Sequence, residues 1–340
     1  MQSYDRAMHE SDRLYEAAAL YYLQDETMES IGTRLKVSRS TVSRMLRQAR
    51  ETGLVRISLA SPDSLSSPLA ERLREAFGVT VHVVPVRDSA RPTNRLDAVA
   101  RQAAMLLAEW MDDETSLGVA WGTTVSAVAN HLPITPTRGS QIVQLNGAAS
   151  TTTTGVAYTG DILARFGQAF DAHVQHFPVP AFFDYVDTRT ALWRERSVRR
   201  VLSMQSRLDI AVFGVGAFQG PTMSHVYAAG YLSAEEMGAL LQEGVVGDIC
   251  TVAIREDGSY ADIPLNARAS GPTPEVLAGV RRRLCVVAGR HRAQATLGAL
   301  RSGAVTDLVV DEQTARALLD RLRSPLPAPV RGRRPTADPR

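Results

Sequence analysis

Cysteine and lysine are both scarce in this chain. Cys250 and Cys285 are the only cysteines among 340 residues, and both lie in apolar, strand-like runs. They do not form a pair at zinc-binding spacing, and they indicate buried free thiols in a reducing compartment. Lysine occurs once, as Lys36, beside 37 arginines. Outside the amino-terminal region, therefore, no lysine can form a Schiff base with a sugar.

Long apolar runs are also missing. No run reaches the roughly 18 residues expected of a membrane span. The first residues, MQSYDRAMHESD, are polar and mixed in charge, unlike a signal peptide. These absences predict a cytoplasmic protein that does not contact a membrane.

The bulk composition is that of a soluble globular protein of more than one domain. Apolar residues make up 44% and charged residues 22% of the 340 residues. The net charge of +2 gives no general affinity for polyanions. Any nucleic-acid contact must therefore come from a local cluster of charge.

Residues 27–47, TMESIGTRLKVSRSTVSRMLR, have the pattern of two short helices joined by a tight turn. Ser38 is a good N-cap for the second helix. Ile31 of the first helix points toward the core, and Gly32 lets the two helices approach closely. From Val42 an apolar stripe follows at helical spacing. A preceding helix over 11–24 would complete a three-helix core. This is the layout of a helix-turn-helix.

The opposite face of the second helix carries short hydroxyls and guanidinium groups, which suit a major groove. Residues 34–56 hold seven basic groups against one acid, whereas residues 1–33 hold two basic groups against seven acids. The alternative, an amphipathic helix pair with a solvated basic face, does not explain this concentration of charge. We expect double-stranded operator DNA to contact Arg39, Ser40, Thr41, Ser43, Arg44 and Arg47.

The remainder of the chain predicts an α/β fold. LVRISLA (54–60) alternates like the strand of a small wing, and the Ser/Pro-rich residues 61–68 form a linker. After a short helix over 69–77, apolar strands alternate with helices, which favours an open, mostly parallel, Rossmann-like sheet. The expected strands are 79–86, 116–122, 141–148, 173–182, 209–218, 284–289 and 307–312. The expected helices are 93–111, 123–131, 157–167, 188–205, 291–301 and 312–322.

These elements define the expected domains. A winged helix-turn-helix domain occupies residues 1–60 and an effector-binding and oligomerisation domain occupies residues 69–323. The last segment, 324–340, is rich in proline and arginine and is expected to be a disordered tail. Ligands of open parallel sheets bind outside the carboxyl ends of the strands.

Gly122, Thr123 and Thr124 form the clearest candidate ligand site, because an apolar strand there leads directly into a helix. The helix N-terminus offers unpaired N–H groups, so a phosphate fits this junction. The alternative is an ordinary threonine N-cap.

Four further candidates lie at expected strand ends. Asn146 and Gly147 would line a sugar pocket or form a turn, and Gly214 and Gly216 would form a tight loop near a ligand. Arg290 and Arg292 place cations at a helix start, where they need an anion. Asp248 would bond sugar hydroxyls or serve as a structural turn acid.

Catalytic and metal sites are poorly supported. His173 and His176 are three residues apart on an expected strand and would point to opposite faces, which makes a poor metal pair. Walker, zinc and nucleophile-elbow motifs are missing. A sugar-phosphate isomerase or deaminase fused to a DNA-binding head is the rival hypothesis, but Asp209 and Asp248 are the only evident strand-end acids and nothing pairs them. A second domain that serves assembly alone is a third hypothesis. We expect no cofactor and no enzymatic activity.

Seven segments of this chain follow one another in a recognisable order. They are LYYLQDETMESIGTRLKVSRSTVSRMLRQARETGLVRI, LGVAWGTTVSAVA, IVQLNGA, DIAVFGVGAF, VVGDI, VVAGRHRAQATLGALRSG and VTDLVVDEQTARALL. Their order resembles the SorC family of sugar-responsive bacterial transcription regulators over nearly the whole chain. The resemblance implies an effector domain with the fold of sugar-phosphate isomerases and deaminases, a sugar or sugar-phosphate effector in place of catalysis, and tetramers on operator DNA.

The resemblance also implies roles for single residues. Gly122, Thr123 and Thr124 match the family's phosphate or sugar loop, and Asn146 and Gly147 match its next loop. Gly214 and Gly216 match the end of its central strand, and Asp248 its GD motif. Arg292 stands where members usually have lysine, and ICTVAIREDG departs from their glycine and aromatics. These departures predict a different ligand pose or a different effector.

Overall fold

The computed structural model describes residues 2–52, 54–55, 67–150, 155–218, 224–228 and 230–323. The chain divides into two compact units, Met1–Leu65 and Ser66–Arg340. The wing expected over 54–60 lies mostly outside the described residues, as do most of the linker and the whole carboxyl-terminal tail.

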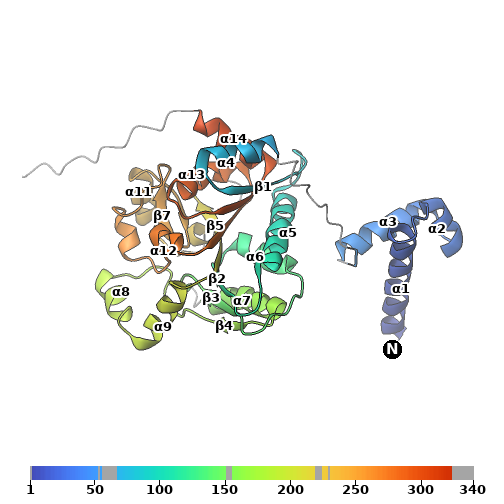
Figure 1. Ribbon diagram of the computed structural model, residues 1–340, viewed down its shortest axis with the longest axis horizontal. Helices are drawn as coiled ribbons and strands as arrows, with labels where there is room; N and C mark the ends of the chain where they lie inside the picture. The colour runs from blue at the N-terminus through green and yellow to red at the C-terminus, as the bar shows by residue number, and fades with distance from the viewer. Residues whose placement is uncertain are drawn as a thin grey trace, which may run out of the picture. The chain divides into compact units, whose positions relative to one another are not determined.

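The amino-terminal unit is a three-helix bundle (Figure 1). Its core contains Ile31, Val42 and Ala49, each with no exposed surface. A Cβ on Gly32 would lie 2.8 Å from the Val37 carbonyl oxygen, so glycine is needed where the turn approaches the first helix of the motif. This confirms the predicted helix-turn-helix. Its helices are α1 (Gln2–Tyr22), α2 (Met28–Leu35) and α3 (Arg39–Glu51).

The larger unit is built on a parallel sheet with the strand order β1-β9-β8-β5-β2-β3-β4. Alternate residues of β8 enter two cores: Leu284 and Val286 pack on one face, and Cys285 and Val287 on the other. Burial on both faces explains why residues 284–287 of β8 are apolar without alternation. The strands are β1 (Thr80–Val84), β2 (Ser116–Val119), β3 (Gln141–Gln144), β4 (His173–Gln175), β5 (Ile210–Ala217), β8 (Arg282–Val287) and β9 (Asp307–Asp311).

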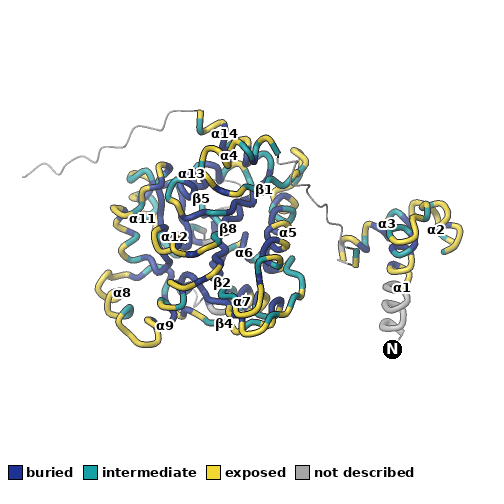
Figure 2. The backbone as a smooth tube through the Cα atoms, in the orientation of Figure 1, coloured by how far each residue is buried: buried dark blue, intermediate teal, exposed yellow. Residues whose placement is uncertain are grey.

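Helices cover both faces of this sheet (Figures 1 and 2). Helices α5, α6 and α7 pack on one face, whereas α4, α9, α13 and α14 pack on the other. The α-helices of this unit are α4 (Pro68–Phe77), α5 (Pro92–Trp110), α6 (Thr123–His131), α7 (Val156–Phe170), α8 (Val186–Leu192), α9 (Arg196–Gln205), α10 (His225–Ala228), α11 (Ala234–Gln242), α12 (Pro274–Ala278), α13 (Ala293–Arg301) and α14 (Glu312–Leu322). The described residues also form two 3₁₀ turns, η1 (Pro264–Ala267) and η2 (Arg290–Arg292).

Two of the expected elements differ most from the structure. The strand expected over 173–182 ends at Gln175, because Pro178 and Pro180 have no N–H to donate to a sheet. The helix expected over 188–205 is broken, and a turn between α8 and α9 packs Trp193 against Phe177 and Phe183.

An antiparallel hairpin was not among the expected strands, although Asp248 was placed at a strand end. Strands β6 (Val245–Ile249) and β7 (Val252–Arg255) extend the sheet from the end of β5. The hairpin turns at Cys250 and Thr251, which both have positive φ although neither is glycine or asparagine. Its turn therefore lacks the usual sequence signal.

Candidate effector cavity and nucleic-acid interface

Helix α3 presents the six residues predicted to contact DNA. The Ser38 hydroxyl accepts a hydrogen bond of 3.1 Å from the Thr41 N–H and so caps the helix. Because Val42, Leu46 and Ala49 are buried, the polar side chains lie on the other side of the helix. Arg39, Ser40, Arg44 and Arg47 are exposed, whereas Thr41 and Ser43 are half-buried.

Two of these arginines already have partners within the unit. Arg39 Nε lies 2.7 Å from Glu29 Oε1, in a pair whose side chains are 69% and 64% exposed. Arg44 donates to the Thr41 hydroxyl over 3.5 Å. Exposed pairs of this kind contribute little to stability. A phosphate or a base edge can therefore replace them at little cost.

The larger unit has a cavity at the carboxyl ends of β2, β3, β5 and β8. After β2 the chain adds β3 and β4 toward one edge of the sheet, and after β5 it adds β8 and β9 toward the other edge. The cavity therefore lies where the strand order reverses. Open parallel sheets bind their ligands at this position. Eight of the ten predicted effector residues line it: Gly122, Thr123, Thr124, Asn146, Gly214, Gly216, Asp248 and Arg292.

The N-terminus of α6 opens into this cavity. Gly122 is the N-cap at φ 141°, and no side chain caps the helix. Thr123 and Thr124 are its first two residues, so neither has the ordinary capping role. A Cβ on Gly122 would have no described atom within 4 Å, which leaves space beside the backbone. The free N–H groups and the partial positive charge of the helix are available to an anion.

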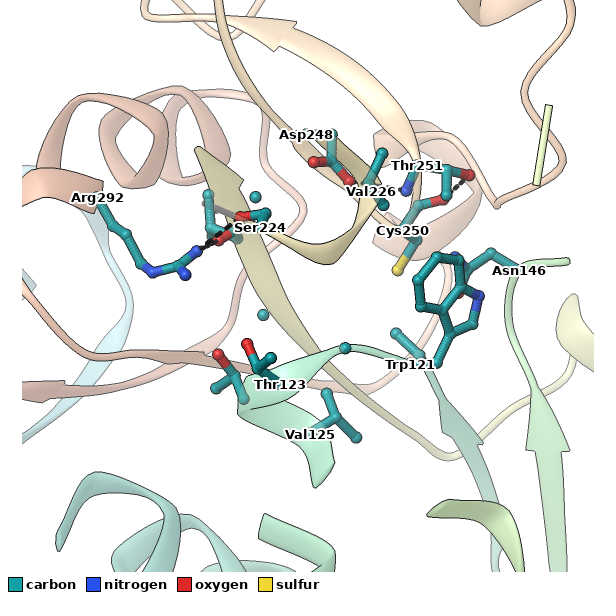
Figure 3. A pocket seen from close by; sticks show the side chains of 16 residues that line it. Trp121, Thr123, Val125, Asn146, Ser224, Val226, Asp248, Cys250, Thr251 and Arg292 are labelled. Carbon is teal, nitrogen blue, oxygen red and sulfur yellow. Dashed lines mark hydrogen bonds between the residues drawn. The ribbon is translucent and has the colours of Figure 1, made fainter. Parts of the chain in front are cut away.

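Arg292 places a cation in the same cavity (Figure 3). Its side chain is buried, and Nη1 donates to the Val215 carbonyl oxygen over 2.5 Å and to the Ser224 hydroxyl over 3.0 Å. Burial lowers the pKa of Arg292, although Asp248 and Tyr227 act in the opposite direction. Among the described residues, no carboxylate forms an ion pair with it, so its charge can serve an incoming anion.

Asp248 provides a buried carboxylate. Its Oδ1 accepts from the Tyr227 hydroxyl over 2.7 Å, and its Oδ2 accepts from the Thr251 N–H over 3.0 Å. Burial raises the pKa of Asp248, and these hydrogen bonds and Arg292 partly offset that rise. A Cβ on Gly216 would lie 1.7 Å from Asp248 Oδ1, which explains the glycine.

Gly214 and Gly216 lie within β5 and do not form the tight loop that the sequence predicted. A Cβ on Gly214 would lie 3.3 Å from Thr124 Cβ, so this glycine allows β5 to pass close to the start of α6. The loop prediction was wrong because both glycines pair with neighbouring strands, Gly214 with Val286 of β8 and Gly216 with Asp248 of β6.

Two predicted effector residues do not line the cavity. A Cβ on Gly147 would lie 2.3 Å from the carbonyl oxygens of Val179 and Pro180, so Gly147 is enclosed by backbone. Arg290 is exposed on η2, two residues before Arg292. Within this 3₁₀ turn, Arg290 is exposed to solvent, whereas Arg292 lines the cavity.

Sequence reasoning missed half of the cavity lining. These residues are Ala120, Trp121, Val125, Val215, Ser224, Val226, Cys250 and Thr251. Ala120, Trp121, Val125 and Val215 adjoin predicted site residues, so proximity in the chain was a usable signal. Cys250 and Thr251 depend on the unpredicted hairpin, and no local motif indicated Ser224.

Together, the fold and the two surfaces define a class of protein: a regulator with a helix-turn-helix head and a ligand-binding α/β domain. The family model described as "Putative sugar-binding domain" matches residues 63–320, and a model for sigma-70 region 4 matches residues 16–52. The chain belongs to the SorC family of sugar-binding transcription regulators. It is a DNA-binding transcription regulator of carbohydrate metabolism.

Individual relatives agree with this assignment. The Deoxyribonucleoside regulator of Bacillus subtilis (strain 168) is 32% identical over 310 residues, which cover 90% of this chain and 97% of the relative. A solved domain of a "possible sugar-binding transcriptional regulator" from Arthrobacter aurescens TC1 is 48% identical, with a TM-score of 0.71, over 76% of this chain and 100% of that one. The full-length Sorbitol Operon Regulator SorC from Klebsiella pneumoniae shares the fold at 23% identity, with a TM-score of 0.66, over 90% of this chain and 98% of that one.

Two further observations concern only the described residues. No helix among them is both long and apolar enough to cross a bilayer. They also contain no cluster of three or more histidine, cysteine, aspartate or glutamate residues that could hold a metal ion.

Proposed function

We propose that a sugar phosphate binds in the cavity and changes the affinity of α3 for operator DNA. The observation that carries this proposal is the buried Arg292, which shares the cavity with the uncapped N-terminus of α6. A guanidinium group, backbone N–H groups and threonine hydroxyls are the donors that bind phosphate in proteins. Asp248 and Asn146 are then available for sugar hydroxyls.

The effector binds without covalent attachment and without turnover. The single lysine of the chain, Lys36, lies at the end of α2, so a Schiff base in the cavity has no amine. Acid/base catalysis requires a positioned proton donor and acceptor. Among the described lining residues, Asp248 is the one carboxylate, and both of its oxygens already accept hydrogen bonds.

The regulator acts in the cytoplasm as a homotetramer. Both cysteines are free and buried, as expected in a reducing compartment. The resemblance to SorC regulators supports the tetramer. An effector that favours one of two arrangements of the subunits would change the spacing of the DNA-binding heads.

Fluorescence anisotropy of DNA from upstream of the protein's own gene tests this proposal. The titrations are run at fixed salt with a panel of sugars and sugar phosphates, because affinity for DNA depends on salt. We expect one phosphorylated sugar to shift the operator affinity, with no comparable shift on random DNA. Tight operator binding that no compound changes would contradict the effector assignment. Binding to this DNA no tighter than to random DNA would exclude it as the operator.

Arg44→Ala provides the DNA-side variant. We expect operator affinity to fall by about 1–3 kcal/mol, with relaxed preference at one base position if Arg44 contacts a base. Arg74→Ala is the matched control, because Arg74 is an exposed arginine of α4 that pairs with Glu71. Unchanged affinity and preference in Arg44→Ala would remove Arg44 from the DNA contacts.

A further inference from the structure

The loop that follows β3 is fixed by hydrogen bonds at nearly every polar backbone group. Gln205 Nε2 donates to the carbonyl oxygens of Gln144 and Leu145, and Gln144 Nε2 donates to the Asn146 carbonyl oxygen over 2.8 Å. The Gly147 N–H donates to the Ser270 hydroxyl over 2.9 Å, and Trp121 Nε1 donates to the Gly147 carbonyl oxygen over 2.9 Å. The backbone that carries Asn146 is therefore rigid and already satisfied.

The Asn146 side chain is the exception in this loop. It is only 2% exposed, yet its Oδ1 is buried without a hydrogen-bond partner. Buried side-chain oxygens are nearly always paired, because an unpaired one loses its bond to water without replacement. Asn146 also lines the cavity. Its amide oxygen thus indicates a hydrogen-bond donor that enters with the ligand.

The surroundings of Asn146 differ from the cationic end of the cavity. In Figure 3, Arg292, Ser224 and Thr123 lie on one side, whereas Asn146 lies beside Trp121 on the other, with the Cys250 sulfur directed toward them. The Trp121 ring stacks on Tyr231 at 5.3 Å between centroids. An indole ring and a thiol form an apolar wall, so water competes poorly for the amide.

We propose that Asn146 selects the effector by accepting a hydrogen bond from one sugar hydroxyl at the end of the cavity away from the phosphate. This inference rests on the proposed function and adds the basis of its specificity. A phosphorylated sugar with that hydroxyl satisfies the buried oxygen, whereas the deoxy analogue leaves it unpaired. A site built around a hydroxyl rejects the analogue that lacks it.

Calorimetric titration of the full chain tests the proposal. The ligands are ribose 5-phosphate, glucose 6-phosphate, the monodeoxy analogues of each, and inorganic phosphate. We expect the wild type to bind one parent sugar phosphate and to bind one of its deoxy analogues about 10- to 100-fold more weakly. In Asn146→Leu, the parent should weaken by a similar factor and the discrimination should vanish. Inorganic phosphate should bind both proteins within about threefold, since it probes the Arg292 end alone.

Two variants make the outcome specific. Asn146→Asp keeps an acceptor oxygen, so it should retain discrimination even if Asn146→Leu fails to fold. Cys250→Ala removes a neighbouring side chain without removing a hydrogen bond, so it should change parent and analogue equally. Retained discrimination in a folded Asn146→Leu protein, or lost discrimination in Asn146→Asp, would overturn the inference while leaving the proposed function intact. If the wild type binds no sugar phosphate of the panel, the proposed function and this inference both fail.

Discussion

The DNA-binding face of α3 and the effector cavity both use arginine, but under opposite physical conditions. Arg44 and Arg47 are exposed on one helix, at positions set by local helical spacing. Arg292 is buried, fixed by two hydrogen bonds, and joined in the cavity by residues from segments more than 100 positions away. An exposed arginine adapts to DNA at little cost, whereas a buried one is oriented before the ligand arrives.

This difference implies different sensitivities to mutation. Exposed contacts on α3 should contribute to affinity one at a time, without effect on folding. The cavity residues constrain one another, so a change there should alter ligand binding and stability together. The following variants test this contrast, from the largest expected effect to the smallest.

Arg292→Met should have the largest effect. Removal of the buried cation should weaken binding of the sugar-phosphate effector by about 2–5 kcal/mol, because its phosphate loses a charge-assisted partner. Operator affinity without effector should stay the same. Arg290→Met is a matched control, since Arg290 is exposed outside the cavity. Calorimetry and anisotropy measure the two affinities, and an equal loss in both variants would contradict the special role of Arg292.

Gly216→Ala should destabilise the larger unit. The new Cβ would lie 1.7 Å from Asp248 Oδ1, so the carboxylate or β5 must move. We expect the free energy of unfolding to fall by about 1–3 kcal/mol. Gly238→Ala in α11 is the control, because its Cβ meets no described atom within 4 Å and alanine favours a helix by about 0.5–1 kcal/mol. Urea denaturation distinguishes them, and equal stability would mean that Asp248 is not fixed against β5.

Ser38→Ala should act on the amino-terminal unit alone. It removes the cap of α3 and should lower the stability of the three-helix bundle by about 1 kcal/mol. Ser38→Asn should preserve stability, since asparagine caps equally well. Thermal unfolding followed by circular dichroism measures the change. A decrease in effector affinity of the same size would show that the two units are not independent.

The smallest expected effect is a pH dependence in the larger unit. Burial, with Arg292, lowers the pKa of His291 from its ordinary value of 6.5. The His291 side chain binds a proton near that pH in the unfolded chain but only at lower pH in the folded chain. The contribution of neutral His291 to stability is therefore fully present above pH 6.5. This contribution should be lost as the pH falls through the lowered pKa. His291→Asn should reduce this slope in urea denaturation between pH 7.5 and 5, and an unchanged slope would exclude His291 as a contributor.

The sequence predicted most of the architecture because much of it depends on local patterns. The predicted bounds of α6 and α14 agree with the structure, since Gly122 marks the start of α6 and α14 directly follows β9. The predicted Ser38 cap and the core positions Ile31 and Val42 are also confirmed. The β6–β7 hairpin was missed because its turn uses Cys250 and Thr251 at positive φ, which no turn motif encodes.

The sequence by itself determined the helix-turn-helix, the parallel sheet and the strand ends from which ligand groups could come. Helical and strand periods are local, and they specify which faces are buried. The tertiary structure decided which of those groups meet. It brings Thr123, Asp248 and Arg292 to one cavity, leaves Arg290 in solvent, and buries the Asn146 oxygen without a partner. Such encounters depend on long-range packing and on the order of strands across the sheet, which spacing along the chain does not specify.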